Sequence, residues 1–206
     1  MNRVAALQRK QNVRIGIDQL PPEIILIIIQ HPIQPPPNNL LTHTIFQFSK
    51  RFRDLALGTP SLWTTIWSSS PRIITELLHR SEGRLLNILY PTLHTRDLVL
   101  PHKARWRSLS YNVVSRALPD WLSSGGVPEL VELSLRLSFP SLVVPFKGIM
   151  PKLRILRKNY LLPLGEDAKG RLEEIEITKG AVSPEAFIDW LPRNNSLRTL
   201  KAHDGQ

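Results

Sequence analysis

The stretch that decides the fold is LVELSL at residues 130–135, with leucine at its first, fourth and sixth positions. In an extended strand the side chains alternate between two faces, so the fourth and sixth positions point the same way. Five further segments follow this spacing: LLNILY (85–90), WRSLSY (106–111), LRILRK (153–158), LEEIEI (172–177) and LRTLKA (197–202). One such strand cannot hide its apolar face alone, so the segments are expected to stack.

The six segments recur at a nearly constant interval. They begin at Leu85, Trp106, Leu130, Leu153, Leu172 and Leu197, with intervals of 21, 24, 23, 19 and 25 residues. Intervals of about 20–29 residues with this spacing are typical of leucine-rich repeats. Residues 70–206 are therefore predicted to form a leucine-rich-repeat-like α/β solenoid that buries the fourth and sixth positions. An unrelated α/β domain with a similar leucine pattern is the alternative.

The repeats are degenerate, and the last of them is uncovered. The asparagine expected nine positions into each unit is missing, and Lys158 and Ala202 fit poorly at the inward sixth position. The final residues, KAHDGQ, supply almost no polar cap for the last unit. The sequence thus predicts a truncated or incomplete product with an exposed edge strand near residues 197–201, and self-association of the purified chain.

Helices are predicted between the strands. Ser70 and Pro71 open the first of them, whose apolar stripe ends before Gly83. Two others are expected around VVSRALPDWLSS (113–124) and SPEAFIDWL (183–191). These helices would line the other side of the arc.

Residues 17–66 have a different, helical pattern. Asp18 is suited to cap a helix whose first turn holds Pro21 and Pro22, and this helix continues through EIILIIIQ and stops before Pro32. After a proline-rich loop, LLTHTIFQFSKRFRDLAL (40–57) places apolar residues at three- and four-residue steps, which indicates a helix with one buried stripe. Gly58 and Pro60 end it. The isoleucines of the first helix cannot share one face, so some must face a partner.

Three blocks in this region, IDQLPPEI (17–24), FSKRFRDLAL (48–57) and TPSLWTTI (59–66), resemble the F-box in the form common in fungal F-box families. The resemblance implies a three-helix module that docks on the Skp-type linker subunit of a cullin–RING ubiquitin ligase. Leu20 and Pro21 match the leading Leu-Pro that meets the linker, and Ile24, Ile27 and Ile28 continue that helix. The proline-rich loop, and the lack of interspersed polar residues in the first helix, depart from the family pattern.

Composition narrows the possible functions. The chain has 206 residues, no cysteine and a net charge of +10, concentrated in a basic leader (1–16) and in residues 71–118. The absence of cysteine excludes disulfides, thiolate nucleophiles and cysteine-based zinc sites, and it suits a reducing compartment such as the cytoplasm or nucleus. A mitochondrial presequence is the alternative for the leader. The longest apolar run, Ile24–Ile29, is too short to cross a bilayer.

The common motifs of catalytic sites are missing from the sequence. The sequence has no phosphate-binding glycine loop, no paired-histidine zinc helix and no nucleophile elbow. Glu174 and Glu176 alternate with apolar residues, which indicates a solvent-exposed face rather than a catalytic pair. We therefore expect a non-enzymatic adaptor without a cofactor or a metal.

Two basic clusters are candidates for substrate binding: Lys103, Arg105 and Arg107 around Trp106, and Arg154 and Arg157 two repeats later. On stacked repeats they could form one positive surface that selects an acidic or phosphorylated substrate. Trp106 either stacks on a nucleic-acid base or packs inward between flanking arginines. The adaptor's partners would be the linker, through it a cullin, and a substrate protein. A basic repeat scaffold that binds nucleic acid or another anion is the alternative function.

Overall fold

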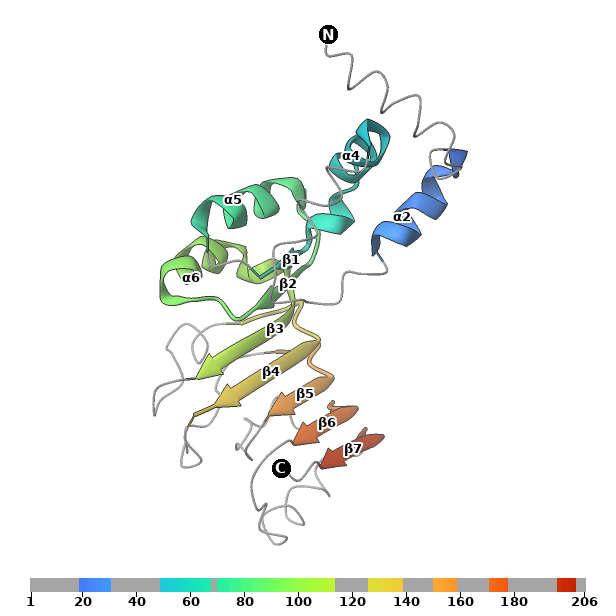
Figure 1. The fold of residues 1–206 in the computed structure, drawn as a ribbon. Coiled ribbons are helices and arrows are strands. Elements are labelled where there is room, and N and C mark those ends of the chain that lie inside the picture. Colours follow the sequence, from blue (N-terminus) through green and yellow to red (C-terminus); the bar gives the residue numbers. More distant parts are fainter. Residues whose placement is uncertain are drawn as a thin grey trace, which may run out of the picture.

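A computed structural model describes residues 19–30, 49–67, 70–113, 126–138, 150–158, 171–177 and 196–202. Its seven strands form one sheet: β1 (Thr65–Ile66), β2 (Leu86–Leu89), β3 (Trp106–Val113), β4 (Glu132–Leu137), β5 (Ile155–Lys158), β6 (Glu174–Ile177) and β7 (Thr199–Ala202). Every neighbouring pair is parallel, and the order in space is the order in sequence. Figure 1 shows the strands stacked along the molecule. The α/β prediction is confirmed.

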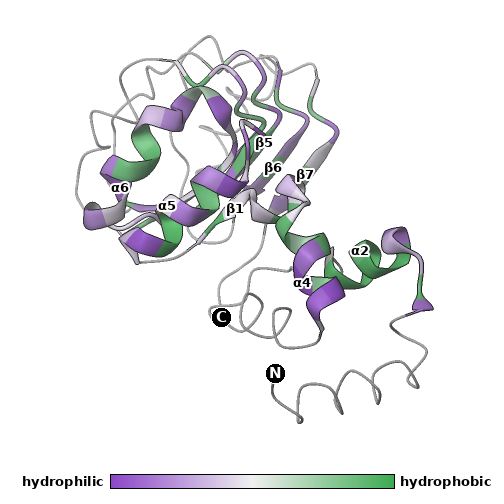
Figure 2. Ribbon diagram, turned by 90° about the horizontal axis from the view of Figure 1, so that it is seen from above, coloured by the Kyte–Doolittle hydropathy of each residue, from purple (hydrophilic) through white to green (hydrophobic). Residues whose placement is uncertain are grey.

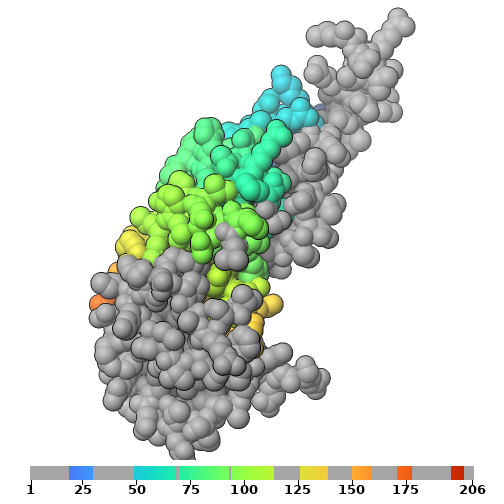
Figure 3. All heavy atoms as spheres, turned by 90° about the vertical axis from the view of Figure 1, so that its left-hand side faces the viewer, coloured from blue at the N-terminus to red at the C-terminus, as the bar shows by residue number. Residues whose placement is uncertain are grey.

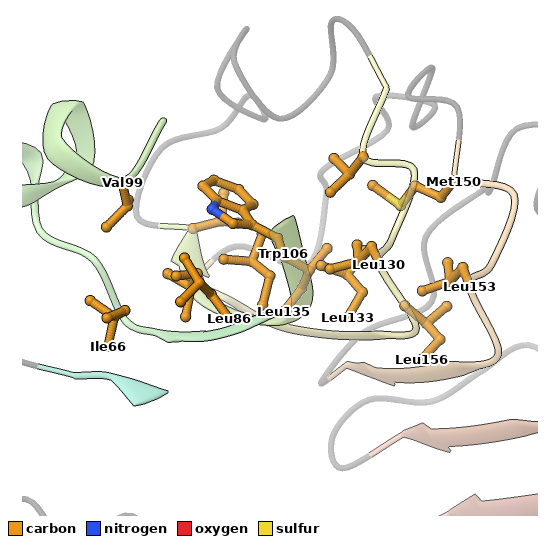
Figure 4. Close-up of a cluster of buried hydrophobic side chains, with 14 of the residues drawn as sticks. Ile66, Leu86, Val99, Trp106, Leu130, Leu133, Leu135, Met150, Leu153 and Leu156 are labelled. Carbon is orange, nitrogen blue, oxygen red and sulfur yellow. The ribbon is translucent and has the colours of Figure 1, made fainter. Parts of the chain in front are cut away.

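The register aligns the fourth positions of the segments in one row. Cα partners run from Ile66 through Ile88, Leu109, Leu133, Leu156 and Ile175 to Leu200. All but Leu200 are buried, and Leu200, on the last strand in the order, remains 44% exposed. Figure 4 shows side chains of successive strands standing on the same side of the sheet. This row is the apolar column that the spacing predicts.

The sixth positions form a second and less regular row. Leu135 and Ile177 are buried, and Lys158 lies between them in register with an exposed fraction of only 3%. Tyr111 is partly buried, whereas Tyr90 is exposed. The prediction that the sixth position is inward is therefore wrong for Tyr90, whose backbone φ of +49° breaks the alternation of the strand.

The first segment is shifted by one residue at its start. Leu85, where the pattern begins the segment, is exposed, and Leu86 takes the buried place beside Trp106. The pairing slips between Leu86 and Asn87, so that Ile88 aligns correctly with Leu109. This shift compensates for the difference of one residue between β2 and β3 at this point, and it keeps the apolar row continuous.

Helices cover one side of the sheet beside its first strands. Helix α5 (Pro71–Arg80) follows Ser70 as predicted, and Gly83, at a φ of +76°, lies in the turn after it. Helix α6 (Leu93–Val99) continues into the 3₁₀ helix η3 (Leu100–Arg105). Residues of α5 and α6 lie beside one another on the surface in Figure 3. The predicted helices around 113–124 and at 183–191 lie almost wholly outside the described residues.

Among the described residues, two helices and a 3₁₀ turn precede the sheet. Helix α2 (Pro22–Gln30) packs on α4 (Lys50–Leu57), which is followed by η2 (Pro60–Trp63) and then directly by β1. The predicted helix ends before Pro32 and at Gly58 are confirmed. The second helix begins only at Lys50, because Ser49 is extended and caps it, so the prediction of one continuous helix over residues 40–57 is wrong. The leader, Asp18, the proline-rich loop and residues 40–48 lie outside the described residues.

The helical part and the sheet share helix α4. Phe52 packs with α2, whereas Ala56 belongs to the core of the sheet. Trp63 joins the two, because its Nε1 donates to the Ala56 carbonyl at 2.8 Å and its ring lies 4.6 Å from the Arg80 guanidinium carbon of α5.

Candidate functional site

Helix α2 carries a ridge of exposed isoleucines, which we call the isoleucine ridge: Ile24, Ile27 and Ile28. Their exposed fractions are 42%, 57% and 42%, and Pro21 is exposed just before them. Leu20, the remaining residue predicted to bind the linker, is partly buried and packs against Phe52 and its neighbours. Figure 2 shows α2 as hydrophobic along most of its length. Three of the five predicted linker-binding residues thus lie on α2 and the other two come just before it, and four of the five are exposed.

The other side of α2 explains why the ridge faces outward. Ile25 and Ile29, four residues apart on the same side of the helix, are buried against Phe52 of α4. A helix that is apolar all round can bury only one side against one neighbouring helix. The remaining isoleucines are therefore left in solvent.

The start of α2 is fixed by polar contacts. The amides of Ile24 and Ile25 donate to the Pro21 carbonyl at 3.1 Å, and the Arg51 guanidinium of α4 donates to the Leu20 carbonyl at 2.8 Å. In α4, the Ser49 hydroxyl accepts from the Phe52 amide at 3.2 Å and caps the helix. These bonds hold the two helices so that the ridge is presented as one surface.

The first basic cluster is mostly structural. Arg105 donates to the Arg84 carbonyl at 2.9 Å and to the Ser81 hydroxyl at 2.8 Å, and Ser81 is fully buried. Burial lowers the pKa of Lys103 and also the pKa of Arg105. Trp106 is fully buried, so it packs inward and cannot stack on a base. Arg107 is exposed and forms no ion pair with the described residues.

The second basic cluster is matched by acids on the neighbouring strands. Arg157 of β5 pairs with Glu132 of β4 and with Glu176 of β6, the latter at 3.1 Å, and its guanidinium lies 3.9 Å from Glu174. Arg154 pairs with Glu173, and Lys201 with Glu174 at 3.1 Å. The acidic cluster therefore lies on the solvent side, as predicted, where it neutralises the arginines proposed to bind substrate.

A hollow of about 250 Å³ opens where β5, β6 and β7 begin. It is lined by Pro151, Lys152, Leu153, Arg154, Arg171, Glu173 and Ser196. Its cations are engaged, since Lys152 pairs with Glu129 at 2.7 Å and Arg171 donates to the Pro151 carbonyl at 2.8 Å. The hollow thus has little spare charge for a ligand.

Tyr90 and Arg136 are two exposed residues whose side chains lie together at the sheet. No pattern in the sequence indicates a role for either of them. The guanidinium carbon of Arg136 lies 5.7 Å from the centre of the Tyr90 ring. The first of these residues follows β2 and the second belongs to β4, so the ring reaches across the end of β3. The positive φ of Tyr90, which causes this arrangement, leaves no signal in the leucine spacing.

Other kinds of site are not found in the described part of the chain. No group of three or more histidine, aspartate or glutamate side chains there could hold a metal ion. The helices within the same residues are all too short or too polar to cross a membrane. Comparisons with protein-family models, with curated proteins and with solved structures gave no match for this chain.

Proposed function

We propose that this chain is a substrate-recognition adaptor of an SCF-type cullin–RING ubiquitin ligase. Its N-terminal helices form an F-box that binds a Skp-type linker subunit, and its sheet region holds the target protein. The isoleucine ridge of α2 carries the proposal, because it lies on the helix that the F-box resemblance assigns to the linker. Such a ligase works in the cytoplasm or nucleus.

The energetic cost of the ridge favours a partner. Burying an isoleucine side chain contributes roughly 1.5–3 kcal/mol relative to leaving it in water. Three half-exposed isoleucines on one nine-residue helix therefore forgo a few kcal/mol until another polypeptide covers them. The buried Ile25 and Ile29 keep the helix in place meanwhile.

The sheet supports the second half of the proposal. Sequential parallel strands, one from each leucine-spaced segment, are the arrangement that a leucine-rich-repeat solenoid requires. Such a platform presents a broad face to a protein target. The adaptor would act by holding that target near the loaded ubiquitin-conjugating enzyme, which raises its effective concentration.

The test is co-expression of the full chain with a Skp-type linker subunit, followed by purification of the complex at physiological salt. The wild type is expected to co-purify with the linker. Replacing Ile24 and Ile27 together by glutamate should weaken binding at least 100-fold, since two buried apolar contacts become desolvated charges. Isothermal titration calorimetry measures the change.

A matched control adds the same two charges elsewhere. Thr75→Glu with Ser138→Glu changes two exposed polar positions of α5 and the end of β4, and should leave linker binding intact. Wild-type chain that is folded but binds no linker would refute the F-box assignment. So would equal binding by the Ile24→Glu, Ile27→Glu variant.

A further inference from the structure

One aromatic ring lies where the strand pattern does not place it. Tyr90 occupies the sixth position of its segment, whose counterparts Leu135 and Ile177 are buried. Its φ of +49° is in the left-handed region, which tyrosine rarely adopts. The residue is 43% exposed. An unfavourable backbone conformation that exposes an aromatic ring does not stabilise the fold, and such conformations gather at binding sites.

Arg136 lies beside this ring on the open face of the sheet. It is exposed, whereas Leu135 and Leu137 on either side of it are buried, so its side chain points away from the core. Within the described residues it forms no ion pair, and its guanidinium lies over the Tyr90 ring. A guanidinium stacked on an aromatic ring is held in plane and keeps the N–H groups at its edge available to an acceptor.

The described residues beside this pair provide further donors, and the acid of β4, Glu132, is paired with Arg157. Asn112 is the register partner of Arg136, and Ser110 is the partner of Ser134 on the same two strands. Across β2 and β3, Asn87 and Ser108 are uncharged, and the exposed Arg107 lies at the beginning of β3. The contrast with Arg157 is direct, since three glutamates surround that arginine. Within the described residues Arg136 is therefore a cation without a matching acid near the ends of β3 and β4, as Arg107 is at the beginning of β3.

We infer that the surface formed by Tyr90, Ser110, Asn112, Ser134 and Arg136 binds an acidic segment of a partner polypeptide. A glutamate or aspartate carboxylate accepts from the Arg136 guanidinium and from the neighbouring hydroxyl or amide groups. Tyr90 covers the apolar part of that segment. This inference rests on the proposed function and deepens it, because it gives the chemical class of the target that the sheet holds.

The experiment measures binding of fluorescein-labelled octaglutamate to the full chain by anisotropy, with octaglutamine as the uncharged comparison. Arg136→Gln should weaken octaglutamate binding at least fivefold. Tyr90→Asn should do the same while the chain stays folded, because asparagine tolerates a positive φ but lacks the ring. Arg72→Gln removes the same charge from an exposed site on α5, and it should change affinity less than twofold.

Three outcomes would overturn the inference. Octaglutamate binding could be unaffected by Arg136→Gln, or reduced equally by Arg72→Gln, which would indicate only a response to net charge. A 12-nucleotide single-stranded RNA could bind more tightly than octaglutamate and lose its binding in Arg136→Gln, which would assign this surface to nucleic acid. The measurement needs no linker subunit, so failure of linker binding with retained octaglutamate binding would count against the F-box assignment alone.

Discussion

Lys158 occupies a place in the sheet interior where its neighbours in register are Leu135 and Ile177. Its side chain is only 3% exposed, and burial lowers its pKa to about 8. The sequence shows the lysine as a misfit at an inward position, but it does not show whether the side chain turns out or stays in. The register decides this, because the hydrogen bonds of β5 to both neighbours fix the direction of the side chain.

The low pKa predicts a pH-dependent stability. Below about pH 8 the ammonium is charged in both states, so its burial cost is present in full. Between pH 8 and 10.5 the unfolded chain binds the proton more tightly, so the free energy of unfolding rises with pH. Lys158→Met should therefore stabilise the chain at pH 7 by up to about 3 kcal/mol. Urea unfolding at pH 7 to 10 checks this.

The difference in unfolding free energy between Lys158→Met and the wild type should stay constant from about pH 7 to 8 and shrink as the pH rises from 8 to 10. Lys201→Met, at an exposed lysine of β7, is the control and should show no such trend. A stability difference that stays constant from pH 7 to 10 would contradict the effect of burial on Lys158.

At the scale of strands, Arg157 connects three neighbouring strands of the sheet. It pairs with acids on β4 and β6 from its own place on β5. Arg157→Met should lower the free energy of unfolding by about 1 kcal/mol at low salt, because three glutamates then lose their common cation. The loss should diminish in 1 M NaCl, since screening weakens both attraction and repulsion. Thermal unfolding or urea unfolding, without guanidinium chloride, measures this loss of free energy at the two salt concentrations.

Arg154→Met, which removes a single pair with Glu173, is the comparison and should cost less. An equal loss in the two variants, or a loss independent of salt, would show that Arg157 acts through packing of its aliphatic part.

The strands were predictable from the sequence because their spacing has a period that burial enforces. The pairing of charges was not, since partners such as Arg157 and Glu132 are 25 residues apart and meet only through register. Counting basic residues in sequence therefore overestimates the positive charge of this face. Tyr90 was not predictable either, because a left-handed tyrosine contradicts local preference. For α2, the composition indicated two apolar sides, but contact with Phe52 decided which isoleucines remain exposed.

At the scale of the whole molecule, two apolar cores are connected through α4 and Trp63. Leu62 packs against both cores, and the Trp63 indole bonds to Ala56. The two parts should therefore unfold together. Trp63→Ala should lower stability by about 3–5 kcal/mol and also separate the cores, so that α2 amides exchange at a lower free energy than those of β3. Native-state hydrogen exchange measures both.

Leu137→Ala, in the sheet core away from this junction, provides the control for lost stability. It should lower protection without creating a gap between α2 and β3. A gap of the same size in both variants would contradict the role of Trp63 as the connection.

The two-residue strand β1 has a consequence for how such proteins diversify. Thr65 and Ile66 directly follow the helical part, yet Ile66 is the first member of the apolar row that continues with Ile88. A recombination event that exchanged the front helices between two genes would bring a foreign first strand with them. Only some exchanges should therefore give a folded protein. In these, the incoming Ile66, or the residue in its place, still fits against the recipient's second strand.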